Sequence, residues 1–330
     1  MTLERLEYAL RAGGLTLPET GTVVFVGLSA EVADLPIPAD RAEIVQSFAP
    51  DHAAWLARGL RVRTAPEGPY AAAVVSLPRA RELAEARIAE AEAMAAGGLV
   101  VLDGAKTDGI EAIAKALRAK GVAPEMVSKA HGKCLWFRAG AHLGDWARPA
   151  MQRNAQGDMV CAGVFSADGA DPASVALAAA LPETLSGEVA DLGAGWGWLS
   201  REVLRRPKVA SLHLVEADLR ALDCARVNAA DARARFHWAD ATGWLSPALL
   251  DAVVMNPPFH VGRKAEPALG QAFVRAAARN LRPSGTLWMV ANRHLPYETV
   301  LADCFREVRE LSGTGGFKIL QATRPSRAAR

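Results

Sequence analysis

The chain has 330 residues and a formal net charge of +2, and a chain of this length indicates two domains rather than one. Hydrophobic residues make up 51% and charged residues 22%, which is typical of a globular protein. No apolar run approaches the roughly 18–20 residues that span a bilayer, so the composition excludes a membrane-spanning protein.

The N-terminus and the cysteines favour a cytoplasmic protein that holds no metal. Residues 1–8 carry three charged side chains and no long apolar core, so we expect no signal peptide. The four cysteines form no CxxC or CxxH pair. This spacing predicts neither a zinc site nor a disulfide scaffold, and it fits a reducing cytoplasm.

Strands and helices alternate through the first half of the chain, from about residue 21 to residue 139. An apolar run at 71–77 leads into Pro78, a helical pattern follows at 81–95, and a second apolar strand follows at 98–103. This order of elements predicts an α/β domain.

A stretch rich in small and polar residues, 140–157, separates the two halves, and we interpret it as a linker. The predicted boundary places a first domain at 1–150 and a second domain at 151–330.

The second half repeats the alternation more clearly. Apolar strands that alternate with amphipathic helices predict a parallel, doubly wound sheet. The predicted strands are 188–192, 211–216, 234–238, 250–255 and 285–291, and the predicted helices are 198–206, 220–230 and 271–281.

The first half resembles a diverged copy of the second, and we interpret the pair as an internal duplication; the alternative is that all such sheets look alike in sequence. Val26-Gly27 is not followed by further spaced glycines, and residues 76–79 read SLPR where the second half has NPPF at 256–259. We therefore expect two tandem Rossmann-like domains, of which the N-terminal one is degenerate.

A glycine-rich loop, 191–197, lies between the first predicted strand and the first predicted helix of the second half. Its glycines are Gly193, Gly195 and Gly197, and Trp198 stands where a dinucleotide-binding loop has its third glycine. Glycines let the backbone turn sharply and approach a ligand closely. This spacing disfavours a nicotinamide or flavin cofactor and resembles the S-adenosylmethionine loop of class I methyltransferases.

Three acids follow consecutive strands of the second half. Asp191 ends the first predicted strand, Glu216 ends the second, and Asp240 follows the third. An acid after the second strand can accept hydrogen bonds from both ribose hydroxyls, as in dinucleotide folds. Asp240 can accept from the adenine amino group.

The tetrapeptide Asn256-Pro257-Pro258-Phe259 ends the fourth strand and is the most specific feature of the chain. Two prolines stiffen the turn and donate no backbone hydrogen bonds. The side-chain oxygen of Asn256 and the carbonyl of Pro257 can then accept from one amino group, while Phe259 stacks on the ring that carries it. Such a turn predicts methyl transfer to the amino group of a base, with Asn256 to Phe259 as the catalytic residues.

Several segments together resemble the bacterial ribosomal RNA small subunit methyltransferase C family. They are NPPFH at 256–260, VANRHLPY at 290–297, GGFKIL at 315–320 and CAGVFSADGAD at 161–171. Members of this family make N2-methylguanine in rRNA with S-adenosylmethionine, and they carry a degenerate methyltransferase-like domain before the working one. The resemblance is good over about 158–323 and weaker in the first half.

The resemblance implies S-adenosylmethionine as the cofactor and small-subunit (16S) rRNA, free or within the small ribosomal subunit, as the partner. It also implies that the segment around Phe165 and Ser166 closes near the cofactor. The second domain, 151–330, would then be catalytic, and the first domain, 1–150, would bind RNA or support the second. The predicted cofactor-binding residues are Phe165, Ser166, Asp191, Gly193, Ala194, Gly195, Glu216, Ala217, Asp240, Ala241 and Asn256.

Basic residues offer candidate RNA contacts. The range 105–138 holds seven Lys and Arg against three acids, and a solvated helix face explains the excess equally well. The candidates are Lys106, Lys129, Lys133 and Lys318.

Other functions stay open. Proline-proline turns of this kind also serve the methylation of guanine N2 in large-subunit rRNA, of adenine N6 and of a glutamine amide in release factors. An RNA-binding factor for ribosome assembly is the alternative from another class of protein. We expect a monomer.

Overall fold

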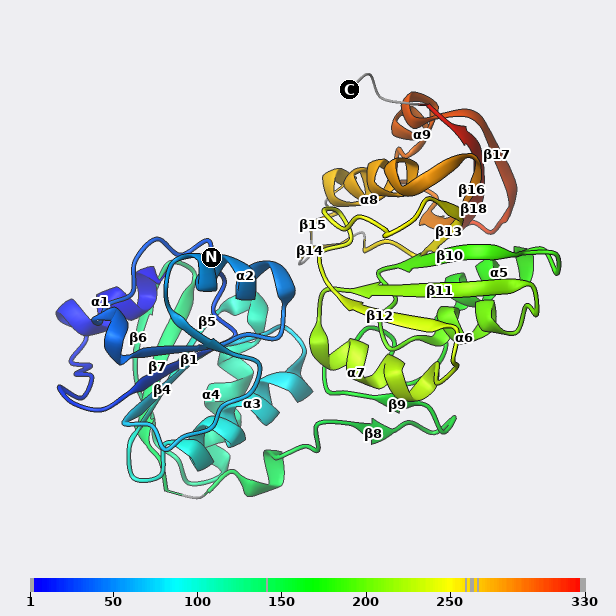
Figure 1. Cartoon of the computed structure of the whole chain (residues 1–330). Coiled ribbons are helices and arrows are strands. Elements are labelled where there is room, and N and C mark those ends of the chain that lie inside the picture. The colour runs from blue at the N-terminus through cyan, green and yellow to red at the C-terminus, as the bar shows by residue number, and fades with distance from the viewer. Residues whose placement is uncertain (1–2, 141, 259, 262–263, 266, 327–330) are drawn as a thin grey trace. The chain divides into compact units, whose positions relative to one another are not determined.

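The computed structural model describes residues 3–140, 142–258, 260–261, 264–265 and 267–326 (Figure 1). The chain divides into two compact units, Met1–Ala150 and Met151–Arg330. Within the described residues, no helix is both long enough and apolar enough to cross a membrane.

The first unit is built on a seven-stranded sheet with the order β3-β2-β1-β4-β5-β7-β6. Its strands are β1 Val23–Val26, β2 Ala42–Val45, β3 Arg61–Arg63, β4 Ala72–Ser76, β5 Leu99–Ala105, β6 Glu125–Lys129 and β7 Gly132–Arg138. Its α-helices are α1 Glu4–Ala12, α2 Ala49–Ala57, α3 Arg81–Met94 and α4 Ile110–Ala119, with 3₁₀ turns η1 Ala39–Arg41, η2 Lys106–Asp108 and η3 Gly144–Trp146.

The second unit has a seven-stranded sheet with the order β12-β11-β10-β13-β16-β18-β17. Its strands are β10 Gly187–Leu192, β11 Val209–Glu216, β12 Ala234–Trp238, β13 Leu250–Met255, β16 Leu281–Asn292, β17 Phe305–Gly313 and β18 Phe317–Pro325. Its helices are α5 Pro172–Ala180, α6 Trp198–Leu204, α7 Leu219–Asn228, α8 Pro267–Asn280 and α9 Glu298–Cys304. Two short hairpins complete it, β8 Gln152–Arg153 with β9 Met159–Val160, and β14 His260–Val261 with β15 Lys264–Ala265.

Both sheets are mixed, which corrects the prediction of a fully parallel sheet. β18 runs antiparallel to β16 and to β17, and β7 runs antiparallel to β5 and to β6. A short turn links β17 to β18 and β6 to β7, and such a turn can join only antiparallel strands because a parallel pair needs a long crossover.

The two sheets share one strand order, and two glycines fix how they correspond. Gly27 follows β1 and Gly193 follows β10, with φ of +70° and +77°. Gly27 donates its backbone N–H to the carbonyl of Val45 at 2.9 Å, and Gly193 donates to that of Val215 at the same distance. Each acceptor is a residue of the neighbouring parallel strand. This shared geometry supports the interpretation of an internal duplication.

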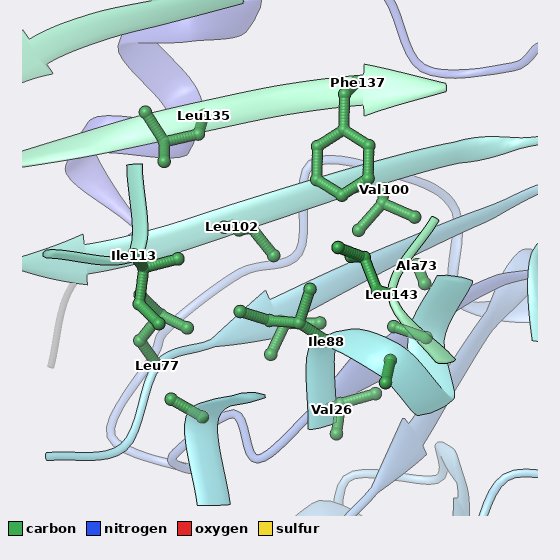
Figure 2. Packing of buried hydrophobic residues seen from close by; sticks show 14 of the residues in the cluster. Val26, Ala73, Leu77, Ile88, Val100, Leu102, Ile113, Leu135, Phe137 and Leu143 are labelled. Atoms are coloured by element: carbon green, nitrogen blue, oxygen red, sulfur yellow. The ribbon is translucent and has the colours of Figure 1, made fainter. Parts of the chain in front are cut away.

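Apolar strand residues build a core on both faces of each sheet. Figure 2 shows one face of the first unit, where Ile88 of α3 and Ile113 of α4 pack against Leu102 and Leu135 of the sheet. Each fully buried aliphatic side chain contributes roughly 1.5–3 kcal/mol. In the second unit, α5, α6 and α7 cover one face and α8 and α9 cover the other. The strands are therefore held in place, and their carboxyl ends are left for a site.

Candidate cofactor and catalytic site

The loop after β10 takes a backbone path that favours glycine at three positions. Gly193, Gly195 and Gly197 have φ of +77°, +56° and +86°, in the left-handed region where L side chains are strained. A Cβ added to Gly197 would also lie 2.9 Å from the Cβ of Ala225 on α7. These glycines therefore shape the loop and let α6 start close to α7.

An open pocket lies beside this loop. It opens where the strand order reverses, between β10 and β13, which is where ligands bind in such sheets. The lining residues are Phe165, Ser166, Asp171, Ser174, Asp191, Gly193, Ala194, Gly195, Trp196, Trp198, Leu199 and Asn256.

Seven of the predicted site residues therefore line one pocket, although they come from distant parts of the chain. They are Phe165, Ser166, Asp191, Gly193, Ala194, Gly195 and Asn256. This clustering is what a shared site for a cofactor and an acceptor requires.

Asp191 is a buried carboxylate at the base of the pocket, with an exposed fraction of 1%. The Ser200 hydroxyl on α6 donates to its Oδ2 at 2.6 Å. Burial raises the pKa of Asp191 to about 7, the nearby Glu216 adds to the rise, and the Ser200 hydrogen bond opposes it. A cation bound in the pocket would therefore meet a carboxyl group that ionises near neutral pH.

Glu216, at the end of β11, ties the glycine loop to the start of α7. Its Oε2 accepts from the backbone N–H of Gly195 at 2.8 Å, and its Oε1 accepts from that of Asp218 at 2.9 Å. Burial raises the pKa of Glu216, and these two hydrogen bonds oppose the rise. In this structure Glu216 supports the loop from the side of the pocket.

Three further predicted cofactor-binding residues, Ala217, Asp240 and Ala241, lie on the loops after β11 and β12, outside the pocket lining. Asp240 is exposed, and its Oδ1 accepts from the backbone N–H and the hydroxyl of Thr242, both at 2.8 Å. Ala241 is buried, and the carbonyl of Ala217 accepts from Nε1 of Trp238 at 2.8 Å. The structure therefore does not bring these three residues into the described pocket.

Phe165 and Ser166 form one lip of the pocket. The indole Nε1 of Trp196 donates to the carbonyl of Phe165 at 3.0 Å, and the Phe165 ring is 62% exposed. Ser166 has φ of +54°, and its hydroxyl donates to the carbonyl of Gly169 at 2.8 Å. The segment is thus held by its backbone, while the aromatic ring of Phe165 faces solvent.

Asn256 follows β13 and faces the pocket from the other side. Its Nδ2 donates to Oδ2 of Asp171 at 3.0 Å and to the Ser174 hydroxyl at 2.8 Å. Pro257 is buried and Pro258 is exposed. The predicted stacking residue, Phe259, lies outside the described residues.

Sequence reasoning missed several lining residues. Asp171 and Ser174 line the pocket and contact Asn256, and Leu199 of α6 lines it as well. Asp171-Pro172 is a typical helix start, an acidic N-cap followed by proline, and could have indicated a helix terminus at this point. No sequence pattern places that terminus beside Asn256, 85 residues away.

The structure corrects the prediction that Lys318 contacts RNA. Its side chain is buried, donates to the carbonyl of Leu295 at 3.2 Å and forms an ion pair with Glu298. A buried and paired ammonium group is not available to a phosphate, because breaking the pair would leave a charge uncompensated.

The other three lysines lie on the first unit. Lys106 and Lys129 are exposed, and the Lys129 ammonium lies 5.7 Å from the centre of the Tyr8 ring. Lys133 is half-buried and forms an ion pair with Glu111 at 2.7 Å. Lys106 and Lys129 are therefore the more accessible candidates. Across the part of the chain that the structure describes, no group of three His, Cys, Asp or Glu residues could hold a metal ion.

The fold and the pocket together define a class of enzyme. A sheet of this strand order, with a glycine loop after β10 and an acid after β11, is that of a class I S-adenosylmethionine-dependent methyltransferase. The methyltransferase small domain family matches residues 159–321.

Comparison with known proteins narrows this class. The chain is 32% identical over 271 residues to ribosomal RNA small subunit methyltransferase C of Pseudomonas paraeruginosa, covering 79% of this chain and 81% of the relative. A T. thermophilus 16S rRNA N2-guanine methyltransferase, solved with AdoMet and guanosine, superposes with a TM-score of 0.75 and 25% identity over 94% of this chain and 90% of its own.

A large-subunit relative is also similar. Ribosomal RNA large subunit methyltransferase G of Shewanella amazonensis is 31% identical over 240 residues, covering 69% of this chain but 63% of the relative. The Pseudomonas relative and the T. thermophilus structure are both covered over larger shares. The chain belongs to the ribosomal RNA small subunit methyltransferase C family, which confirms the resemblance found in the sequence.

Proposed function

We propose that this chain transfers a methyl group from S-adenosylmethionine to the exocyclic N2 of a guanine in small-subunit rRNA. The observation that carries the proposal is the hydrogen bonding of the Asn256 side chain. Both hydrogen bonds from its Nδ2 go to protein oxygens, so its Oδ1 is left as an acceptor at a pocket lined by the glycine loop. An amino group is the substrate that such an acceptor fits.

The pocket residues fit the proposed cofactor. The Cβ position of Gly195 meets no atom within 4 Å, so the loop leaves open space where a ligand can approach its backbone. Asp191 and Glu216 supply the carboxylates that would hold an ammonium group and ribose hydroxyls. When bound, S-adenosylmethionine supplies an electrophilic methyl group.

The protein's contribution to the reaction is orientation of the acceptor. An exocyclic amine is a weak nucleophile because its lone pair is delocalised into the base. Acceptance of its hydrogens by Asn256 Oδ1 and the Pro257 carbonyl favours a more pyramidal nitrogen with its lone pair aimed at the methyl group. Such positioning can supply about 7–11 kcal/mol of the barrier. The proton can leave after attack, so no strong base is needed first.

The target base has to leave its stack to reach Asn256. Extrusion costs a few kcal/mol, which favours an accessible or partly unfolded site in the RNA. We propose that the second unit is catalytic and that the first grips RNA or supports the second. The exposed Lys106 and Lys129 on the first unit support a contact with phosphates. We further propose that the enzyme is a cytoplasmic monomer and acts on rRNA or on the small ribosomal subunit.

Transfer of labelled methyl from S-adenosylmethionine to rRNA of methylation-deficient cells tests the proposal. Both ribosomal subunits and free rRNAs are offered, and the product nucleoside is identified by digestion and mass spectrometry. N2-methylguanine in small-subunit rRNA is the expected product.

Three other outcomes would overturn the proposal in part or in whole. Label in large-subunit rRNA moves the target to the activity named for the Shewanella relative. N6-methyladenine keeps the cofactor and changes the base. No label in any RNA directs the search to a protein glutamine and then to a role in assembly.

A further inference from the structure

The orientation of the Asn256 side chain is fixed by two neighbours that belong to another part of the chain. Its Nδ2 donates to the carboxylate Oδ2 of Asp171 at 3.0 Å and to the hydroxyl of Ser174 at 2.8 Å. A carboxamide nitrogen carries two hydrogens, so both are used. A reversed carboxamide would set its oxygen against the Asp171 carboxylate, and two acceptors repel.

Asp171 and Ser174 are themselves held rigidly. Asp171 is the N-cap of α5, and its Oδ2 also accepts from the backbone N–H of Ser174 at 2.8 Å. Pro172 occupies the first helical position, where its fixed φ suits the helix. The buried Leu177 anchors α5 to the core of the second unit. The pair therefore forms a fixed support for Asn256 at the wall of the pocket.

We propose that Asp171 and Ser174 are positioning residues for methyl transfer and set the acceptor polarity of the site. They hold the Asn256 carboxamide so that its oxygen, and not its nitrogen, faces the target group. A reversed carboxamide would present N–H donors to an amine that also carries N–H donors. The same polarity selects an exocyclic amino group over a carbonyl oxygen, which can only accept. The inference rests on the proposed function, since it needs Asn256 at the reacting amine.

The first test separates positioning from helix capping. Oδ2 of Asp171 accepts from both the Ser174 N–H and Asn256 Nδ2, so the oxygen of an Asn at this position can keep both contacts. Asn caps a helix about as well as Asp, so Asp171→Asn keeps α5 but replaces a charged acceptor with a neutral one that holds Asn256 less firmly. We expect kcat to fall about 10- to 100-fold, since small misplacements of a reacting group cost up to ~10²-fold. The thermal midpoint, the Kd of S-adenosylmethionine and the KM for RNA stay at the wild-type values.

Two variants accompany this test. Ser174→Ala removes the second acceptor and should lower kcat in the same way. Asp168→Asn changes an exposed acid three residues before Asp171, removes the same charge and should leave kcat unchanged. An equal loss in the Asp168 control would attribute the effect to local charge and overturn the inference.

Exchanging donor and acceptor in the hydrogen bond between residues 256 and 171 gives the sharper test. Asn256→Asp places two carboxylates together and should abolish most turnover. With Asp171→Asn added, the carboxamide at 171 can turn its Nδ2 toward the new carboxylate and give up its contact with the Ser174 N–H. The second oxygen of the new carboxylate then faces the substrate. The double variant should therefore recover kcat above that of Asn256→Asp alone. Wild-type kcat in Asp171→Asn together with no recovery in the double variant would overturn the inference.

Different results would overturn the proposed function and the positioning role of Asp171 and Ser174. If Asn256→Ala retains near-full turnover, Asn256 does not orient the amine, and both proposals fall. If Asn256→Ala removes turnover while Asp171→Asn and Ser174→Ala keep it, only the positioning role is lost.

Discussion

Gly27 and Gly193 take corresponding places in the two sheets, yet their surroundings differ. A Cβ on Gly27 would lie 2.2 Å from Nη1 of Arg87 on α3, whereas a Cβ on Gly193 would meet Cε1 of Phe273 on α8 at 3.3 Å. The Arg87 guanidinium thus covers the loop of the first unit. In the second unit the loop borders an open pocket.

Strand register shows that the functional side chains differ at corresponding positions. Asp191 pairs with Val254, and Phe25 pairs with Val74. Two residues further on, Asn256 corresponds to Ser76. The carboxyl group of Asp191 in the second unit is thus replaced in the first by the fully buried ring of Phe25. The amide of Asn256 is replaced by the buried hydroxyl of Ser76.

The ends of β11 and β2 also carry different side chains at corresponding positions. Asp191 pairs with Leu214 and Phe25 with Ile44, so Glu216 corresponds to Gln46. The neutral amide of Gln46 holds its loop by donating through Nε2 to the carbonyl of Leu28 at 3.0 Å and to Oδ2 of Asp51 at 3.4 Å. The comparison teaches that buried apolar strands preserve the fold, while residues at the strand ends decide whether it holds a ligand.

The largest expected effect contrasts Asn256 with its counterpart Ser76. Asn256→Ala should lower single-turnover methyl transfer about 10²- to 10³-fold, as removal of one oriented hydrogen-bonding group does in other active sites. Its affinity for S-adenosylmethionine should stay near wild type in calorimetry. Ser76→Ala should leave both quantities unchanged, and a comparable loss there would end the distinction between the units.

The pH dependence of stability should report the raised pKa of Asp191. Folded Asp191 keeps its proton up to about pH 7, whereas an unfolded Asp loses it near 3.9. The folded state then binds more protons between about pH 4 and 7. The free energy of unfolding should therefore fall as pH rises through this window, by at most about 1.4 kcal/mol per pH unit, and level off above it.

Asp191→Asn should make this slope shallower, because an amide does not titrate; Glu216, Asp103 and Asp51, whose pKa values burial also raises, keep their share of it. Urea unfolding at several pH values, followed by tryptophan fluorescence, measures it. Asp40→Asn, at an exposed acid of the first unit, is the matched control and should keep the wild-type slope. An unchanged slope in Asp191→Asn would show that Asp191 ionises at its ordinary pKa.

A smaller effect is expected when Glu216 is given the side chain of its counterpart. Glu216→Gln should raise the Kd of S-adenosylmethionine roughly 10- to 100-fold, since hydrogen bonds to a charged group contribute about 1.5–3 kcal/mol. The reciprocal Gln46→Glu should leave this Kd unchanged, because the Arg87 side chain covers Gly27. A change of Kd in Gln46→Glu would reveal a ligand site in the first unit.

The smallest effect concerns RNA. Lys129→Glu should weaken RNA affinity modestly and reduce the slope of log K against log salt by about 1, the expectation for one phosphate contact. Lys208→Glu, at an exposed lysine of the second unit, is the control for net charge. Equal salt slopes in both variants would place no specific RNA contact at Lys129.

Local sequence pattern located many elements of the site but not their partners. Gly193, Gly195 and Asn256 were found because left-handed turns and proline-stiffened strand ends need particular residues. Asp171 and Ser174 were missed as partners of Asn256, because their contact depends on how α5 packs against the sheet. The burial of Lys318 was missed for the same reason, since GGFKIL reads equally well as a solvated strand end.

The sequence by itself determined the α/β class, the glycine loop after β10 and the Asn-Pro-Pro turn after β13, because period, turn chemistry and backbone restriction act over a few residues. Only the tertiary structure decided the mixed sheet, the Arg87 cover over Gly27 and the support of Asn256 by Asp171. These features join residues far apart in the chain. Their energies depend on packing and desolvation, which no local pattern encodes.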